Sequence, residues 1–213
     1  MKLSILGDSI STYMGLSNDA DANPTTAYNS VYYRPPFPLE RTYWMRVINE
    51  LNLELCVNNS WSGGNLSGRD DPTSGLNRAG QLCRNDGTSP DIIILFMGTN
   101  DLGRRVPLEI FADDYAETLK IIKENHPSAY VCCVNIPDRD IYLKPSAEKF
   151  NAAIADAVKE AGSKFFIADL FGSRLRGDFY YMNTTDGLHP DEDGMKIIAE
   201  IICNTIKQNI KNQ

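Results

Sequence analysis

The sequence has no excess of basic residues and no long apolar run. Its 21 Lys and Arg residues stand against 28 Asp and Glu residues, which leaves a formal net charge of −7. That balance argues against a sequence-independent grip on nucleic acid or on an anionic membrane surface. No apolar run approaches the ~18 residues of a membrane span, and Leu3–Leu6 meets Gly7 too soon to form a signal-peptide core. We therefore expect a soluble protein of the cytoplasm, with neither nucleic acid nor membrane as a partner.

Cysteine is too scarce and too scattered for a disulfide framework. The chain has five cysteines, an odd number, and no two of them have C-x-x-C spacing. Cys132 and Cys133 would point to opposite faces of a strand, so they cannot together form half a metal site. A Gly-rich phosphate loop with a lysine and a dinucleotide fingerprint are also missing. We expect buried cysteines that act as small apolar side chains, no metal and no cofactor.

What the sequence does contain is an alternation of short apolar runs with longer amphipathic stretches. Its 213 residues suit one domain, 1–213, with a long insertion at about 12–39. The apolar runs predict strands over Leu3–Leu6, Leu53–Val57, Ile92–Met97, Tyr130–Val134 and Phe165–Ala168. Helical periodicity predicts helices over Arg41–Leu51, Leu108–Asn125, Ala147–Ala161 with Ser146 as its N-cap, a last helix from about Pro190, and a weaker one over Ser74–Asn85.

This alternation predicts an α/β fold. Strands that alternate with helices form right-handed βαβ units and a parallel sheet between two helix layers. Five strands suit the flavodoxin-like order 2-1-3-4-5. The expected architecture is therefore a three-layer αβα sandwich around a flavodoxin-like five-stranded parallel sheet.

Polar clusters follow the first three predicted strands. They are Gly7–Ser11, Asn58–Gly64 and Gly98–Asp101. Because the carboxyl ends of parallel strands lie at one edge of a sheet, these clusters are expected to meet there, with the first between the other two. Open α/β sheets bind their ligands at that place.

A fourth cluster, Asp186–Pro190, contains one of the two histidines of the chain. The Asp186 carboxylate, three residues before His189, can accept the Nδ1–H of the imidazole and leave Nε2 free as a base. A hydroxyl nucleophile needs such a base, and Ser9, at a predicted strand-to-helix turn, is the best-placed candidate. The other histidine, His126, lies at a predicted helix end, where a solvated structural role is expected.

Donors for an oxyanion are expected at the same edge of the sheet. The backbone N–H of Ser9 would point toward the site from a helix N-terminus. A glycine N–H from Gly63 and the side-chain amide of Asn100 are expected to converge from the flanking loops. Donors from separate rigid elements are what a tetrahedral intermediate requires.

Together the four clusters resemble the signature blocks of the SGNH (GDSL-type) hydrolases, in family order and across nearly the whole chain. The resemblance implies ester hydrolysis without a cofactor, on the same sandwich fold, and hence a small-molecule ester as substrate. It also implies the roles of five residues. They are Ser9 as nucleophile and oxyanion donor, Gly63 and Asn100 as oxyanion donors, His189 as base and Asp186 as the group that orients it.

Two departures from the family pattern bear on the substrate. Trp61 is bulky where family members often carry a small or aliphatic residue, and we expect it to line the acyl pocket. The insertion at 12–39 is longer than the usual link. Its aromatic residues, Phe37 among them, and its asparagines favour a surface that binds a sugar over an apolar tunnel that binds an acyl chain. The candidate substrate-binding residues are Asp8, Trp61, Tyr32, Tyr33 and Arg34.

The leading interpretation is a serine esterase that removes a small acyl group, such as acetyl, from a carbohydrate-like alcohol. A lysophospholipase or thioesterase is the second enzyme interpretation, and a long apolar cleft beside Ser9 would support it. From another class, a non-catalytic flavodoxin-like binding module would keep the loops for a nucleotide. The aromatic residues of the insertion also suit contacts between copies of the chain, so a homo-oligomer stays open.

Overall fold

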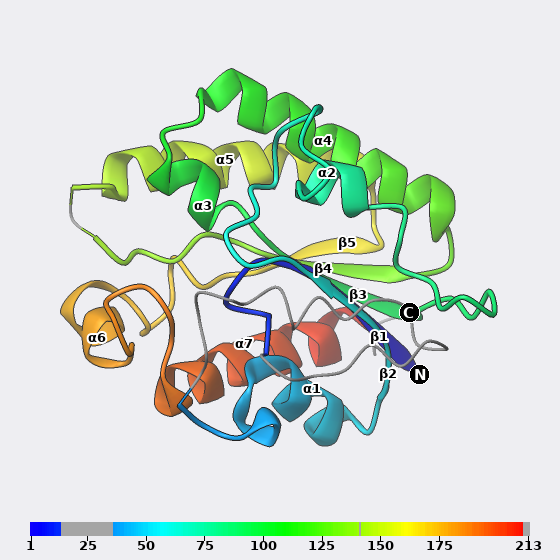
Figure 1. Ribbon diagram of the computed structural model, residues 1–213, viewed down its shortest axis with the longest axis horizontal. Coiled ribbons are helices and arrows are strands. Elements are labelled where there is room, and N and C mark those ends of the chain that lie inside the picture. The colour runs from blue at the N-terminus through cyan, green and yellow to red at the C-terminus, as the bar shows by residue number, and fades with distance from the viewer. Residues whose placement is uncertain (14–35, 141, 211–213) are drawn as a thin grey trace.

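A five-stranded sheet lies at the centre of the computed structural model, which describes residues 1–13, 36–140 and 142–210 (Figure 1). Its strands run in the order β2-β1-β3-β4-β5, and every pairing between neighbours is parallel. The strands are β1 Lys2–Gly7, β2 Glu54–Ser60, β3 Ile92–Phe96, β4 Tyr130–Val134 and β5 Phe165–Ala168. The predicted fold class and strand order are confirmed.

Helices cover both faces of the sheet. Figure 1 shows α1 and α7 on one face and α2, α4 and α5 on the other. The helices are η2 Leu39–Arg41, α1 Tyr43–Leu51, α2 Gly75–Arg78, α3 Thr99–Gly103, α4 Leu108–Asn125, α5 Lys144–Ala161, α6 Gly177–Met182 and α7 Glu192–Ile210. The short helices α3 and α6 lie in the connections that follow β3 and β5.

The central strand β3 shows how the two helix layers are held. All five of its side chains are buried. Ile92 and Ile94 belong to the hydrophobic cluster that contains the inner faces of α1 and α7. Ile93 and Leu95 belong to the cluster formed with α4 and α5. Because successive side chains of a strand point to opposite faces, an unbroken apolar run is what a strand needs when it is covered on both sides.

Several predicted helix limits differ from the structure at their polar ends. α5 begins at Lys144, with Pro145 in its first turn, so Ser146 lies inside the helix and is not its N-cap. Proline is tolerated there because the first helical N–H groups have no partner within the helix. The helix predicted over Ser74–Asn85 covers only Gly75–Arg78. The helices α3 and α6 are too short to produce a periodic pattern, and the sequence did not indicate them.

Most of the cysteines are buried, as the sequence predicted. All five are free, and Cys56, Cys132, Cys133 and Cys203 are buried, whereas Cys83 is only partly buried. Cys132 and Cys133 join the two different hydrophobic clusters on opposite faces of β4. Within the described part of the chain, no helix is long and apolar enough to cross a membrane.

The insertion at 12–39 is described only at its two ends. The candidate substrate-binding residues Tyr32, Tyr33 and Arg34 lie outside the described residues. Phe37 is buried in the cluster between the sheet and the α1–α7 layer, and its carbonyl accepts a hydrogen bond from the Tyr13 hydroxyl at 3.0 Å. Phe37 is therefore a core residue and is not available to a substrate.

Candidate active site

Three strands end level with one another, and this brings three of the polar clusters together. Gly7, the last residue of β1, pairs with Ser60 of β2 on one side and with Phe96 of β3 on the other. The next residues of each chain segment therefore leave the sheet at the same edge. This edge lies at the point where the strand order reverses, because β1 sits between strands that follow it in the sequence.

Ser9 lies in a tight turn directly after β1. The turn closes with a hydrogen bond from Ser11 N–H to Asp8 O at 3.0 Å, and Asn58 Nδ2 of β2 donates to Ser11 O at 3.0 Å. A side chain at Gly7 would collide with that of Ser11, so glycine is needed where the strand meets the turn. The prediction that Ser9 opens a helix is wrong, because residues 8–11 form a turn without a helix.

The structure brings Ser9, His189 and Asp186 into one chain of hydrogen bonds. The Ser9 Oγ lies 2.9 Å from Nε2 of His189, and Nδ1 of the same ring lies 2.7 Å from Oδ2 of Asp186. Ser9 is 7% exposed, and the imidazole is largely covered, while the Asp186 side chain is about half exposed at 48%. This geometry places a hydroxyl, a base and a carboxylate in line at the edge of the sheet.

The loop before α7 holds Asp186 and His189 in that arrangement by its own hydrogen bonds. Oδ1 of Asp186 accepts the backbone N–H of Leu188 at 3.0 Å and that of His189 at 2.8 Å. Partial burial acts to raise the pKa of Asp186, but the hydrogen bonds from the His189 backbone and side chain and from Leu188 together hold the pKa below its usual value. Asp186 is therefore held as the carboxylate that pairs with the ring.

The predicted oxyanion donors lie on the two flanking connections. Gly63 has a φ of 74° and occupies a turn that is closed by a 3.0 Å hydrogen bond from Gly64 N–H to Trp61 O. Asn100 lies in α3, and its Nδ2 donates to Gly64 O at 3.0 Å and to Asp8 Oδ2 at 3.4 Å. The side-chain amide of Asn100 thus links the turn of Gly63 to the turn of Ser9.

Asp8 does not lie where a substrate-binding residue would. It is 1% exposed, and its Oδ1 accepts the N–H of Ile10 at 3.0 Å while its Oδ2 faces Asn100. Burial raises the pKa of Asp8 to about 7, against the opposing effects of the Ile10 hydrogen bond and the positive charge of Arg78. Asp8 was predicted to bind substrate, but the structure buries it and places its carboxylate against the side-chain amide of Asn100.

Arg78, which the sequence did not single out, is buried beneath the edge. Its guanidinium donates to the carbonyl oxygens of Gly7 at 3.1 Å and Thr73 at 2.9 Å, and to that of Asn59. It therefore ties the ends of β1 and β2 together. Burial lowers the pKa of Arg78 to about 10, which leaves it charged at neutral pH. An arginine in a segment with a weak helical pattern is normally expected to face solvent. No local feature of the sequence therefore indicated that Arg78 is buried.

Asp101, next to Asn100, fixes the loop that follows the Gly63 turn. Its Oδ2 accepts the N–H of Leu66 at 2.7 Å, and its Oδ1 accepts the N–H of Ser67 at 3.0 Å and the Ser67 hydroxyl. Asp101 is fully buried, and it anchors the β2–α2 loop to α3. The sequence marked this residue as part of a polar block but did not reveal its role.

Trp61 and His126, which the sequence also singled out, differ in their location and burial. Trp61 is only partly buried and donates its backbone N–H to Gly7 O at 3.1 Å, so it lies at the catalytic edge. His126 is not solvated: it is 4% exposed at the end of α4, and its Nδ1 lies 3.5 Å from Cys83 Sγ. Burial lowers the pKa of His126. No group of three or more metal-ligating side chains occurs among the described residues.

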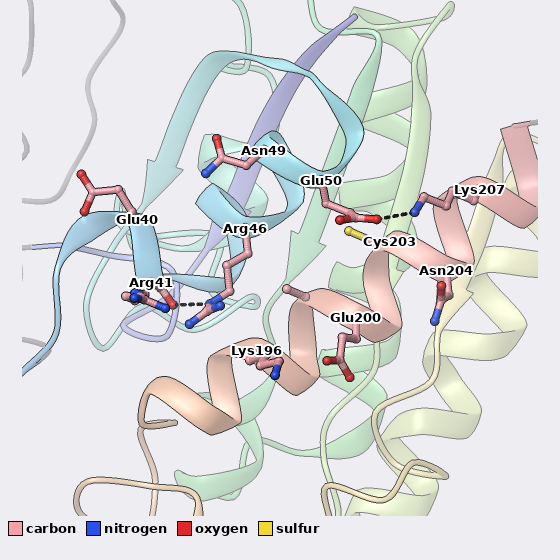
Figure 2. Close-up of a pocket in the computed structure, with 11 residues that line it drawn as sticks. Glu40, Arg41, Arg46, Asn49, Glu50, Lys196, Glu200, Cys203, Asn204 and Lys207 are labelled. Atoms are coloured by element: carbon pink, nitrogen blue, oxygen red, sulfur yellow. Dashed lines mark hydrogen bonds and ion pairs between the residues drawn. The ribbon is translucent and has the colours of Figure 1, made fainter.

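Two hollows of similar size differ in their relation to this edge. A cleft of about 730 Å³ is lined partly by Asp186, Gly187 and Leu188, so one of its walls is the loop that carries His189. A second groove, of about 690 Å³, lies between α1 and α7 (Figure 2). Its charged side chains include the ion pair of Glu50 and Lys207 at 2.6 Å, and it contains no residue of the four polar clusters. Of the two, only the first cleft is lined by residues of the polar clusters.

The sequence matches the model of the GDSL-like lipase/acylhydrolase family over residues 5–197. It is 27% identical to the GDSL esterase/lipase WDL1 of Oryza sativa subsp. japonica over 143 residues, which are 56% of this chain and 54% of the rice protein. The match therefore spans about half the length of that relative. It is also 23% identical to the arylesterase of Vibrio mimicus over 176 residues, 81% of this chain and 82% of that enzyme.

A solved structure shares the fold. The family two carbohydrate esterase from Clostridium thermocellum, determined in complex with cellohexaose, superposes with a TM-score of 0.72 at 17% identity. The likeness covers 99% of this chain and 64% of that one. At this level of identity the comparison establishes a common architecture.

Proposed function

The chain belongs to the GDSL-like lipase/acylhydrolase family and is an ester hydrolase, and from this premise we propose that Ser9 is its nucleophile, His189 its general base and Asp186 the residue that orients the base. The single observation behind this proposal is the chain of hydrogen bonds from Ser9 through His189 to Asp186, at 2.9 and 2.7 Å. A nucleophile and a base need separations of about 2.6–3.2 Å for proton transfer.

In the proposed reaction Ser9 Oγ attacks the ester carbonyl carbon. A C–O bond forms, the π electron pair moves to the carbonyl oxygen, and the hydroxyl proton passes to Nε2 of His189. The intermediate then collapses, its bond to the leaving oxygen breaks, and Nε2 returns the proton to the departing alcohol. Water repeats the two steps on the acyl-serine, which releases the carboxylic acid and restores Ser9.

Asn100 and Gly63 are the proposed oxyanion donors, together with the N–H of Ser9. Both Nδ2 contacts of Asn100 are made within the protein, to Gly64 O at 3.0 Å and to Asp8 Oδ2 at 3.4 Å. The longer contact, to Asp8, is the weaker of the two and is the one that the amide would exchange for the oxyanion. A donor held in place before the reaction needs little reorganisation in the transition state.

We propose a small acyl group, such as acetyl, and a carbohydrate-like alcohol as the two parts of the substrate. The cleft beside the His189 loop is lined by Arg139, Asp140 and Asp178 as well as by the loop itself. Charged walls suit a polyhydroxylated alcohol, whose hydroxyl groups both donate and accept hydrogen bonds. The carbohydrate esterase that shares the fold is consistent with this choice.

Hydrolysis of simple esters tests the proposed function. The protein should release acetate from ethyl acetate faster than it releases longer acids from the corresponding ethyl esters, and Ser9→Ala should abolish both reactions. Ser146→Ala, at an exposed serine of α5, is the matched control and should retain full activity. An undiminished rate in Ser9→Ala would refute the assignment of the nucleophile. Binding of a nucleotide without any ester turnover would instead support a non-catalytic module.

A further inference from the structure

The cleft beside the His189 loop is lined by the three residues that precede His189. It is formed by Arg139 and Asp140 of the β4–α5 connection, by Gly177, Asp178 and Tyr181 of α6, and by Asp186–Leu188. His189 follows Leu188 directly, and in the proposed reaction its Nε2 hands the proton to the alcohol. The alcohol therefore has to approach from the His189 side of Ser9, away from Asn100.

Tyr181 gives this cleft an exposed aromatic surface that is held in place. Its side chain is on α6, and the residue is 66% exposed. A Cβ added at Gly187 would lie 2.8 Å from Cε2 of the Tyr181 ring, so the ring packs closely against the backbone of the catalytic loop. Gly187 also has a φ of 84°, which favours glycine. An aromatic face fixed beside a base is suited to stacking on the apolar face of a sugar ring.

Arg139 is the one cationic side chain among the residues that line the cleft. Its Nε is buried and has no hydrogen-bond partner among residues 1–13, 36–140 and 142–210. A Cβ at Gly103 would lie 3.6 Å from its Nη2, so the guanidinium reaches α3, the helix that carries Asn100. Its positive charge also lowers the pKa of Asp8. Arg139 lines the cleft and is only partly buried, so its guanidinium can donate hydrogen bonds to a ligand bound there.

The charges of the cleft favour a neutral ligand over an anionic one. One cation, Arg139, is accompanied by three carboxylates, Asp140, Asp178 and Asp186. Arginine only donates hydrogen bonds and carboxylates only accept them, whereas a sugar hydroxyl does both. A uronic acid or a phosphate would be repelled by the three carboxylates and by the formal net charge of −7 of the whole chain. A neutral ring rich in hydroxyls matches both kinds of group.

We propose that this cleft is the leaving-group subsite and that it binds one neutral sugar ring of an acetylated saccharide, stacked on Tyr181 and hydrogen-bonded by Arg139. The inference rests on the proposed esterase function and adds to it the residues that select the alcohol. Tyr181 and Arg139 contact the substrate in this arrangement and take no part in bond breaking. Their loss should therefore weaken binding of the saccharide and leave the chemical step unchanged.

The test compares two acetate esters, one with a ring in its alcohol and one without. Acetate release is measured from an O-acetylated cello-oligosaccharide and from ethyl acetate. Tyr181→Ala and Arg139→Met should each raise the KM for the saccharide by about tenfold, with kcat within about twofold. Tyr181→Ala should keep the wild-type kcat/KM on ethyl acetate, which also shows that it is folded, and Arg139→Met should lose more kcat/KM on the saccharide than on ethyl acetate. Tyr181→Phe should retain the wild-type KM, because it keeps the ring.

Phe179→Ala is the matched control, because Phe179 is a partly exposed aromatic residue of α6 that does not line the cleft. It should behave as wild type on both esters. Equal losses on both esters in Tyr181→Ala would overturn the subsite, since the ring would then only support the catalytic loop. An Arg139-dependent preference for an acetylated glucuronide over the matching glucoside would overturn the neutral ring.

The two proposals fail in different ways. Ser9-dependent release of acetate from ethyl acetate, without turnover of any acetylated saccharide, would refute the subsite and leave the esterase intact. Absence of turnover of either ester would refute the esterase itself. Direct binding of the deacetylated oligosaccharide to Ser9→Ala, followed by calorimetry, gives a readout that needs no catalysis. Binding should weaken by about tenfold when Tyr181→Ala is added.

Discussion

Burial and hydrogen bonding give two carboxylates at the catalytic edge opposite properties. Asp8 is buried, and its pKa is raised to about 7. Asp186 is about half exposed, and its pKa is lowered by three hydrogen bonds from Leu188 and His189. The neutral form of Asp8 is therefore available near neutral pH behind Asn100, while Asp186 stays ionised beside the imidazole. Asp8 follows a glycine and Asp186 precedes one, so their sequence contexts are similar. Their pKa values differ because their surroundings in the folded protein differ.

The raised pKa of Asp8 predicts a pH-dependent stability that Asp8→Asn should remove. Between its unfolded pKa of about 3.8 and its folded pKa of about 7, the folded protein keeps a proton that the unfolded chain has released. This contribution is complete below pH 4 and is lost as the pH rises through 7. Relative to Asp8→Asn, the wild type should thus lose about 2–3 kcal/mol of unfolding free energy between pH 5 and pH 8.

Urea unfolding of both proteins at pH 5, 6 and 8 measures that difference. Titration of all other groups, Asp186 included, is common to the two proteins and cancels in the comparison. Parallel pH profiles for wild type and Asp8→Asn would mean that Asp8 is ionised in the folded protein over this range.

At the scale of elements, turns and short helices carry the proposed reacting groups, and buried side chains of neighbouring elements hold those turns in place. Ser9 and Gly63 lie in four-residue turns, and Asn100 lies in the five-residue helix α3. Arg78 of α2 donates to the carbonyls at the ends of β1 and β2. Asp101 accepts the N–H groups of the loop after Gly63. Buried charges with several hydrogen bonds replace the regular backbone pairing that ends where the strands stop.

Arg78→Leu should destabilise the protein more than a change at a surface arginine. It leaves the buried carbonyls of Gly7 and Asn59 and the partly buried carbonyl of Thr73 without this donor, at a cost of roughly 1 kcal/mol or more each. We expect a loss of about 3 kcal/mol or more in urea unfolding. Arg174→Leu removes only an exposed ion pair with Glu200 and should cost at most about 1 kcal/mol. Similar losses in both variants would show that Arg78 does not hold the strand ends.

At the scale of the whole molecule, the polar clusters meet because β1 lies inside the sheet, between β2 and β3. β1 has β2 and β3 as neighbours, so the connections that leave these strands diverge around the turn of Ser9. The last polar cluster returns to the same edge just before α7, which packs against α1 and the sheet in one hydrophobic cluster. The reacting groups are 180 residues apart in the sequence, so only the completed fold brings them together.

This long-range assembly predicts that Ser9 and His189 act as one unit. Ser9→Ala and His189→Ala should each lower kcat on ethyl acetate by on the order of 10³-fold or more, and the double variant should lose little further. His126→Ala, at the buried end of α4, is the control and should keep kcat within a few-fold of wild type. Multiplicative losses in the double variant would indicate that the two groups act independently.

The sequence by itself determined the strands, their order and the four clusters at the sheet edge. An unbroken apolar run such as Ile92–Phe96 is a local signal for a strand covered on both faces, and β4 and β5 match their predicted limits. Asp186 and His189 are close enough in the chain for their contact to be anticipated from spacing alone. Helix ends were less certain, because Pro145 is allowed in the first turn of α5.

Only the tertiary structure decided which polar side chains are buried and what they face. Asp8 and Arg78 look like ordinary turn and surface residues in the sequence, yet both are buried within the edge. The contact of Tyr181 with Gly187 joins α6 to the catalytic loop, and no periodic pattern encodes it. Local periodicity reports the burial of apolar faces. The pKa of a carboxylate and the surroundings of the Arg139 guanidinium depend instead on neighbours brought together by the packing of distant segments.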